Sequence, residues 1–114
     1  MIRLAAFDLD QTLFGTDLVI SPRVQQAVAQ AQEQGVIVTI ATGREAHLTA
    51  RFARQLNLTA PLVCAQGALV YDFLADRALH DVRLPSELLP KVIEATAKYG
   101  WNLHFEMPHG LFLP

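Results

Sequence analysis

The stretch that decides the fold is Phe7-Asp8-Leu9-Asp10-Gln11-Thr12, together with the apolar residues before it. The run Ile2–Leu9 is mostly apolar and predicts a buried strand. Asp8 and Asp10 stand at its end, so an extended chain would point both carboxylates to the same side. In an open parallel α/β sheet, ligands bind outside the carboxyl ends of the strands. The pair therefore predicts a polar site at that edge of a sheet.

The elements expected after this strand alternate between helix and strand. They are a helix over 22–34, a strand over 36–41, a helix over 44–57 and a strand over 62–65. Ser21-Pro22 supplies an N-cap and a proline at the first helical position, and the strand over 36–41 is β-branched and apolar, as in a strand covered on both faces. Leu48, Phe52 and Leu56 share one helical face. This order predicts an α/β fold with a parallel sheet and right-handed crossovers.

The second half of the chain has a different character. We expect a strand over 68–73, a half-exposed alternating segment over 79–84, and a strand with one wet face from Trp101 to Glu106. Between the last two, Ser86 is expected to cap a helix that carries Pro90 in its first turn and ends at Gly100. Leu111–Leu113 is expected to begin one more strand.

Composition and charge restrict the class of protein. The chain has 114 residues, a net charge of −2, 52% hydrophobic and 18% charged residues, which predicts one packed domain, or a domain with a fragment of another. It has no basic footprint for nucleic acid or an anionic membrane. Because Cys64 is the single cysteine, the chain cannot form an internal disulfide. The simplest interpretation of Cys64 is a small buried hydrophobic residue. Without a signal-peptide core or a membrane-length apolar run, a cytoplasmic protein is expected.

The expected strand ends bring together groups suited to phosphoryl transfer. Thr42-Gly43-Arg44-Glu45 has the form of a capping box, so the Thr42 hydroxyl would lie beside a helix N-terminus that favours an anion. Two carboxylates nearby suit a bound Mg²⁺, which offsets their repulsion of a phosphate. One carboxylate can attack phosphorus. The other, kept partly protonated by its neighbour's charge, can protonate the leaving group.

Each of these residues could also have a purely structural role. Asp8 and Asp10 could be turn or cap residues, because Asp is common after strands. Thr42 could be a helix N-cap, and Thr12 a loop hydroxyl. Gln66-Gly67, at the expected end of the third strand, is a turn signal that is weak by itself. The four histidines show no metal-ligand spacing.

Taken together, these segments resemble three motifs of one family. Asp8-Leu9-Asp10-Gln11-Thr12-Leu13 resembles the first motif of the haloacid dehalogenase (HAD) superfamily, D-x-D-G-T-L. The segment 40–44 resembles the second motif of its Cof-type branch (subfamily IIB), where A-T-G-R is frequent, and 66–68 resembles that branch's N-G-A turn. The resemblance covers essentially the whole chain. It implies a Rossmann-like core, whose N-terminal βαβαβ part is residues 1–75, and the beginning of an α+β cap domain in residues 76–114.

The resemblance also implies roles for individual residues. Asp8 corresponds to the phosphorylated nucleophile and a Mg²⁺ ligand, and Asp10 to the general acid/base, whose backbone carbonyl also binds the metal. The implied substrate- or phosphate-binding group is Thr42, Gly43, Arg44, Leu9 and Thr12, with Thr42 supplying the hydroxyl. The implied activity is Mg²⁺-dependent hydrolysis of small phosphate monoesters, such as sugar phosphates, through an aspartyl-phosphate.

The sequence departs from the family pattern in three ways. Gln11 replaces the usual Gly and Gln66 the usual Asn. The third motif's Lys and the fourth motif's acidic metal ligands have no counterpart in these 114 residues. We therefore expect a truncated or partial enzyme with weak or absent turnover. Without the later strands, the first strand would have a free edge, so self-association through that edge is a further expectation, which a monomer with a hydrogen-exchange-protected first strand would contradict.

Two other functions stay open at this point. A phosphomutase shares the aspartyl-phosphate and would return the phosphate to another carbon of the same sugar. A non-catalytic module would bind phosphate, Mg²⁺ or a protein partner and form no covalent intermediate.

Overall fold

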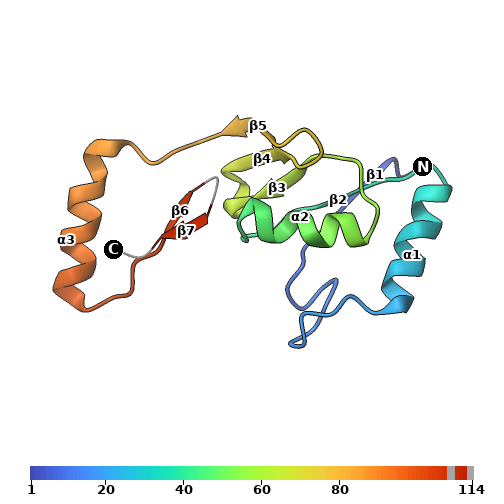
Figure 1. Cartoon of the computed structure of the whole chain (residues 1–114), viewed down its shortest axis with the longest axis horizontal. Coiled ribbons are helices and arrows are strands. Elements are labelled where there is room, and N and C mark those ends of the chain that lie inside the picture. Colours follow the sequence, from blue (N-terminus) through green and yellow to red (C-terminus); the bar gives the residue numbers. More distant parts are fainter. Residues whose placement is uncertain (108–109, 113–114) are drawn as a thin grey trace.

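The structure is a computed structural model that describes residues 1–107 and 110–112. Its elements alternate as expected in the first half and form separate hairpins in the second (Figure 1). In chain order they are β1 (Leu4–Phe7), α1 (Pro22–Glu33), β2 (Ile37–Ile40), α2 (Ala46–Gln55), β3 (Leu62–Cys64), the 3₁₀ turn η1 (Ala65–Gly67), β4 (Leu69–Asp72), β5 (Arg77–Asp81), the 3₁₀ turn η2 (Ser86–Leu88), α3 (Leu89–Tyr99), β6 (Phe105–Met107) and β7 (Gly110–Phe112).

Parallel pairing of the first three strands confirms the predicted α/β class. β1 pairs with β2 in parallel, with Leu4 opposite Ile37. A parallel bridge between Ala41 and Val63 joins the end of β2 to β3. β3, β4 and β5 then form an antiparallel meander. The carboxyl ends of β1, β2 and β3 consequently lie at one edge, which is where the sequence places its polar residues.

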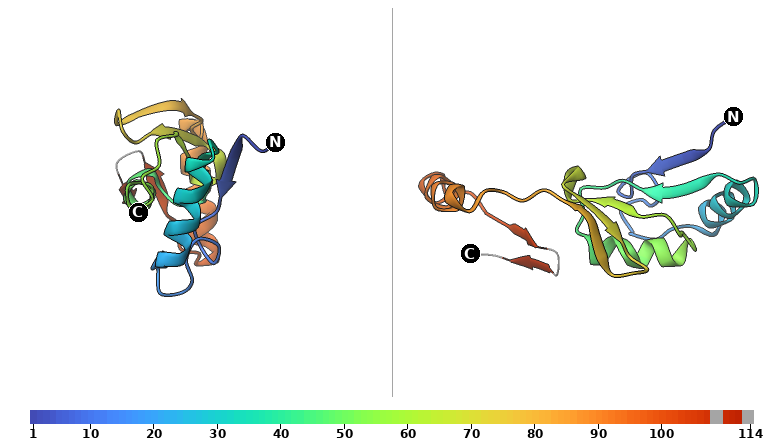
Figure 2. Two further views of the ribbon diagram at one scale, coloured as in Figure 1. Left: turned by 90° about the vertical axis from the view of Figure 1, so that its right-hand side faces the viewer. Right: turned by 90° about the horizontal axis from the view of Figure 1, so that it is seen from above.

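The core lies between these strands and the first two helices. α1 and α2 both pack on β2, and α2 also packs on β3; Figure 2 shows both helices on one side of the strands. The buried side chains include Leu9, Ile20, Ile40, Phe52, Leu62 and Cys64. Burial raises the pKa of the Cys64 thiol to about 11, as expected for an inert buried hydrophobe. Ser21 caps α1 as predicted, its hydroxyl accepting the Val24 N–H at 3.3 Å.

The prediction that Ile2–Leu9 forms a buried strand was wrong. β1 spans only Leu4–Phe7, and its residues alternate between exposed and half-buried. Leu4 is 57% exposed and its cross-strand neighbour Ile37 is 53% exposed. The reason is that both helices cover the opposite face. Among the described residues β1 pairs only with β2, so it is an edge strand.

The second half of the chain confirms the helix but moves its start. Ser86 begins the η2 turn and caps nothing; α3 follows from Leu89, without a side-chain cap, and Pro90 lies in its first turn. The helix ends as predicted at Gly100, which has a φ of 65°. Such a left-handed residue is typical of a helix end. No helix among the described residues has the length and apolarity that crossing a membrane requires.

The strand expected from Trp101 begins only at Phe105. Residues 101–104 have no regular structure, and the Trp101 ring stacks on Tyr99 with ring centroids 5.0 Å apart. β6 then pairs with β7, which covers part of the strand expected at 111–113; Leu113 lies outside the described residues. An extended segment over 82–85 connects β5 to this part of the molecule (Figure 1).

Candidate active site

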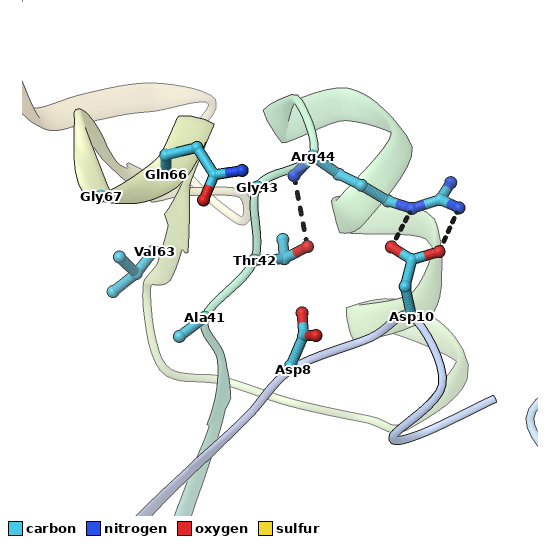
Figure 3. A pocket seen from close by; sticks show the side chains of 9 residues that line it. All are labelled: Asp8, Asp10, Ala41, Thr42, Gly43, Arg44, Val63, Gln66 and Gly67. Carbon is cyan, nitrogen blue, oxygen red and sulfur yellow. Dashed lines mark hydrogen bonds and ion pairs between the residues drawn. The ribbon is translucent and has the colours of Figure 1, made fainter.

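An open cleft lies at the carboxyl ends of the three parallel strands. Its lining comes from three short segments that are far apart in the sequence: Asp8 and Asp10, Ala41–Arg44, and Val63 with Gln66 and Gly67. Figure 3 shows the Asp8 carboxylate directed toward Thr42 and the Asp10 carboxylate turned to Arg44, with Thr42 between the two aspartates and Gln66. The cleft thus brings together five of the seven residues that the sequence indicated, namely Asp8, Asp10, Thr42, Gly43 and Arg44.

A tight turn after β1 brings the two carboxylates to the cleft. The carbonyl oxygen of Leu9 accepts N–H groups from Thr12, Leu13 and Phe14 at 3.0 to 3.2 Å. This turn reverses the chain directly after the strand, so Asp8 and Asp10 stay at the sheet edge while Leu9 enters the core. Among the described residues no hydrogen bond or ion pair to the Asp8 carboxylate is found. Asp8 is therefore not serving as a turn or cap residue.

Asp10 is held by a bidentate ion pair with Arg44. The guanidinium donates from Nε to Oδ2 and from Nη2 to Oδ1, both at 2.7 Å. This hydrogen bonding is the main reason that the pKa of the Asp10 carboxyl is lowered. The prediction that Asp8 keeps Asp10 partly protonated is therefore wrong. The two carboxylates are close in sequence, but the Arg44 cation contacts Asp10 directly and outweighs the neighbouring charge.

Thr42 is buried at the base of the cleft and is fixed by its backbone. Its N–H donates to the Val63 carbonyl at 2.9 Å, which ties the end of β2 to β3. Its hydroxyl accepts the Arg44 N–H at 3.2 Å and closes a short turn. The hydroxyl thus shapes the loop before α2 and caps no helix.

The predicted capping box at residues 42–45 was also wrong. α2 begins at Ala46, and Glu45 is its N-cap: the Glu45 carboxylate accepts the N–H groups of His47 and Leu48. A carboxylate that already satisfies these groups leaves them unavailable to an anion. An anion in the cleft must therefore be held by side chains and by loop N–H groups.

Leu9 and Thr12 lie outside the cleft lining. The Leu9 side chain is fully buried in the core, and exposed Thr12 lines a neighbouring groove with Gln11 and residues 13–17. Any role of Leu9 at the substrate would have to use its backbone. The substrate-binding roles of both residues stay predictions.

The sequence placed Gln66-Gly67 at the end of the third expected strand but gave these residues no role in the site. They line the cleft, as do Ala41 and Val63, which the sequence analysis did not single out. All four follow from the rule that parallel strands end at one edge. The sequence signal was present, but each residue type by itself is common in turns.

The Asp10–Arg44 pair makes a prediction about pH. A lowered pKa means that the pair stabilises the fold above the carboxyl's unfolded value, about 3.9, and that this contribution is lost as the pH falls through the lower folded value. Asp10→Asn should therefore have a lower melting temperature than the wild type at neutral pH. The gap should close in acid and shrink in high salt. A gap that is the same at every pH would contradict the charge-based account.

Gln11 gives a prediction about stability. Its φ of 57° lies in the left-handed region, where the family pattern has Gly. Gln11→Gly should raise the free energy of unfolding by about 0.5–1 kcal/mol, the left-handed penalty less the greater chain entropy of glycine. Denaturant unfolding measures this. Gln11→Ala keeps the strained φ and should show no gain, so an equal effect of Gly and Ala would show that the side chain matters and the backbone does not.

The donor set of the cleft fits part of a Mg²⁺ site. Mg²⁺ binds through one or two carboxylates, with water and substrate phosphate completing its octahedron. The Asp8 carboxylate lines the cleft and can serve as one such ligand, whereas Arg44 holds both oxygens of the Asp10 carboxylate, so Asp10 would bind the ion through its backbone carbonyl. Within residues 1–107 and 110–112 no group of three or more potential ligands occurs. Asp8 and Asp10 are candidates for holding the ion, as the sequence predicts.

Comparison with known proteins gives one consistent family. The model of the haloacid dehalogenase-like hydrolases matches residues 5–113. An HMP-PP phosphatase from Serratia proteamaculans is 34% identical over 118 residues, covering 95% of this chain. A haloacid dehalogenase-like hydrolase from B. subtilis has a TM-score of 0.86, with 22% identity over 99% of the chain. A HAD/COF-like hydrolase from Plasmodium vivax has a TM-score of 0.72, with 26% identity over 87%.

These relatives are all longer than this chain. The matched part amounts to 43%, 39% and 37% of their respective lengths. The chain therefore spans less than half the length of the proteins that it resembles.

Proposed function

This chain belongs to the haloacid dehalogenase-like hydrolases, of the Cof type, and from this premise we propose that its cleft is the phosphoryl-transfer site of a phosphatase acting on small phosphate monoesters. The observation that carries the proposal is the shared cleft of Asp8, Asp10 and Thr42 at the ends of the parallel strands. The groups come from two motifs, the aspartate pair from the first and Thr42 from the second, and the fold brings these motifs together. Sugar phosphates and similar metabolites are the substrate class that we propose.

In the proposed reaction Asp8 is the nucleophile. Its carboxylate, which forms no hydrogen bond or ion pair with a described residue, attacks phosphorus, and the ester oxygen leaves as the phosphoryl group bonds to Asp8. Water then attacks this aspartyl-phosphate, releasing phosphate and restoring the carboxylate. Thr42, with Gly43 and Arg44, would hold the phosphoryl oxygens. Bound Mg²⁺, held by Asp8 and Asp10, would neutralise charge on the phosphate.

Asp10 is the proposed general acid and base, and the structure adds a condition to that role. An ionised carboxylate bound to Arg44 is set up to accept a proton, not to donate one. To protonate a leaving group, Asp10 must first take up a proton and give up the Arg44 contact. We infer that a bound phosphate, by attracting the same guanidinium, weakens that contact.

Phosphate release from an aryl phosphate, with and without Mg²⁺, tests this proposal. Release by the whole chain should depend on Mg²⁺, stop on chelation and require Asp8. Because the chain spans less than half of its relatives' length, slow turnover is expected. A rate indistinguishable from buffer would overturn the catalytic proposal for these residues and favour the alternative of a non-catalytic phosphate- or Mg²⁺-binding module.

Three further expectations remain proposals. We place the division between core and cap near residues 75 and 76; β5 lies beyond that point but still pairs with β4, so the connection over 82–85 offers the better-separated boundary. Self-association through β1 is supported by its unpaired edge among the described residues and by exposed Leu4. A cytoplasmic location rests on the sequence alone.

A further inference from the structure

We propose that the side-chain amide of Gln66 is a specificity-determining group, which selects phosphate esters whose leaving group carries a neutral hydrogen-bonding substituent such as a hydroxyl. The inference rests on the proposed function, because it concerns the part of the substrate beyond the phosphate.

Gln66 lies in the cleft on the side opposite Asp10 (Figure 3). Its amide lies directly against Gly43: a Cβ built on Gly43 would be 2.1 Å from Nε2 and 2.8 Å from Cδ of Gln66. Any side chain at position 43 would force the amide away. The absence of a side chain at Gly43 is therefore what lets Gln66 reach over the segment that connects Thr42 to Arg44.

The backbone around Gln66 is strained. Ala65, Gln66 and Gly67 have consecutive positive φ values of 51°, 55° and 91°. The first two are not glycines, and each such residue carries a strain of about 1–3 kcal/mol. The Ala65 N–H donates to the Arg44 carbonyl at 3.0 Å, which ties this turn to the loop that bears Thr42. The strained turn thus sets the Gln66 side chain against the cleft.

The position of the amide favours contact with the leaving group. Thr42 is 7% exposed at the base of the cleft, whereas Gln66 is exposed at its mouth. A phosphoryl group at Asp8 and Thr42 would leave the rest of the ester at the mouth. Asp10 and Arg44 pair with each other, and in the proposed reaction they act on the phosphoryl group and the ester oxygen. The Gln66 amide is uncharged and offers two donors and an acceptor, and no hydrogen bond to it occurs among the described residues.

Binding of three probes to the whole chain, in the presence of Mg²⁺, tests this inference. The probes are inorganic phosphate, phenyl phosphate with an apolar leaving group, and glycerol 3-phosphate with two hydroxyls. Gln66→Ala should weaken the binding of glycerol 3-phosphate by about three- to tenfold, the range for one neutral hydrogen bond. It should leave the affinity for the other two probes unchanged. The Gln66 side-chain NH₂ signals in NMR should shift with glycerol 3-phosphate and not with inorganic phosphate.

Two further variants serve as controls. Gln11→Ala removes the other loop glutamine at positive φ, which lines the neighbouring groove, and should bind all three probes like the wild type. Gln66→Asn keeps an amide one methylene shorter on a residue that accepts this φ, and should lose only part of the preference.

The outcomes separate the inference from the function that it rests on. If Gln66→Ala loses affinity equally for all three probes, Gln66 either binds the phosphate or maintains the structure. That result would overturn the inference but not the proposed function. So would an unchanged affinity for glycerol 3-phosphate. Failure of the wild type to bind inorganic phosphate would overturn the proposed function and the inference with it.

Discussion

Replacing Leu9 by alanine is expected to lower the free energy of unfolding by about 2–5 kcal/mol, the range for a large buried side chain cut back to Ala. Leu9 is fully buried between two exposed carboxylates. Its side chain joins the core at the point where its carbonyl closes the turn after β1. A small α/β unit has about 5–15 kcal/mol of stability in total, so the variant should be close to unfolding. Denaturant titration followed by circular dichroism measures the loss.

Leu4→Ala is the matched control for this experiment. Leu4 belongs to the same strand region but is 57% exposed, so its replacement should change stability by no more than about 0.5 kcal/mol. Similar losses for the two variants would mean that β1 is covered in solution, as self-association through its edge would require. A stable Leu9→Ala protein would instead contradict the assignment of Leu9 as a core anchor.

The sequence predicted the fold where the hydrophobic pattern and the end signals agree. Ser21-Pro22 and Gly100 mark helix ends that the structure confirms. The β-branched run over 36–41 predicted a strand covered on both faces, and in β2 Val38, Thr39 and Ile40 are buried while Ile37 is exposed. These signals are local, because they depend on the backbone needs of a few neighbouring residues. They therefore survive in any arrangement of the chain.

Properties that depend on distant partners were not predictable in the same way. Thr42 and Glu45 have the spacing of a capping box, yet Glu45 itself caps α2, and the choice between the two depends on where β2 releases the chain. The burial of β1 depends on which of its faces other elements cover, and the local hydrophobic pattern does not indicate this. The Asp10–Arg44 pair joins residues 34 positions apart, so the sequence could place both near the site without showing that they neutralise each other.

The same distinction decides how far the site itself could be predicted. Motif spacing was enough to bring Asp8, Asp10 and Thr42 to one edge, because the ends of parallel strands must meet there. Motif spacing was not enough to predict the protonation state of each group, because protonation and access depend on contacts that extend over only a few ångströms. Gln66 illustrates the same limit: its amide faces the cleft only because position 43 is a glycine and the turn after β3 is left-handed.

Asp8→Asn is expected to reduce Mg²⁺-dependent phosphate release to the buffer rate. Removing a nucleophile costs about 10³-fold or more in enzymes generally, and an amide cannot attack phosphorus as a carboxylate does. The variant should also fail to gain the mass of a phosphoryl group after rapid acid quenching, which the wild type should show if the intermediate accumulates. Asn is nearly the same size, and Asp8 has no hydrogen-bond partner among the described residues, so the fold should be unaffected.

Asp17→Asn is the control that separates the nucleophile from the general effect of losing a negative charge near the site. Asp17 is exposed on the neighbouring loop, where its carboxylate accepts the Val19 N–H at 3.2 Å, and it lies outside the cleft lining. Its variant should release phosphate at the wild-type rate, with the same dependence on Mg²⁺. Phosphate release that persists in Asp8→Asn would refute the assignment of Asp8 as the nucleophile. Equal losses in both variants would point to charge or stability as the cause, because only one of the two carboxylates can reach a phosphate held at Thr42.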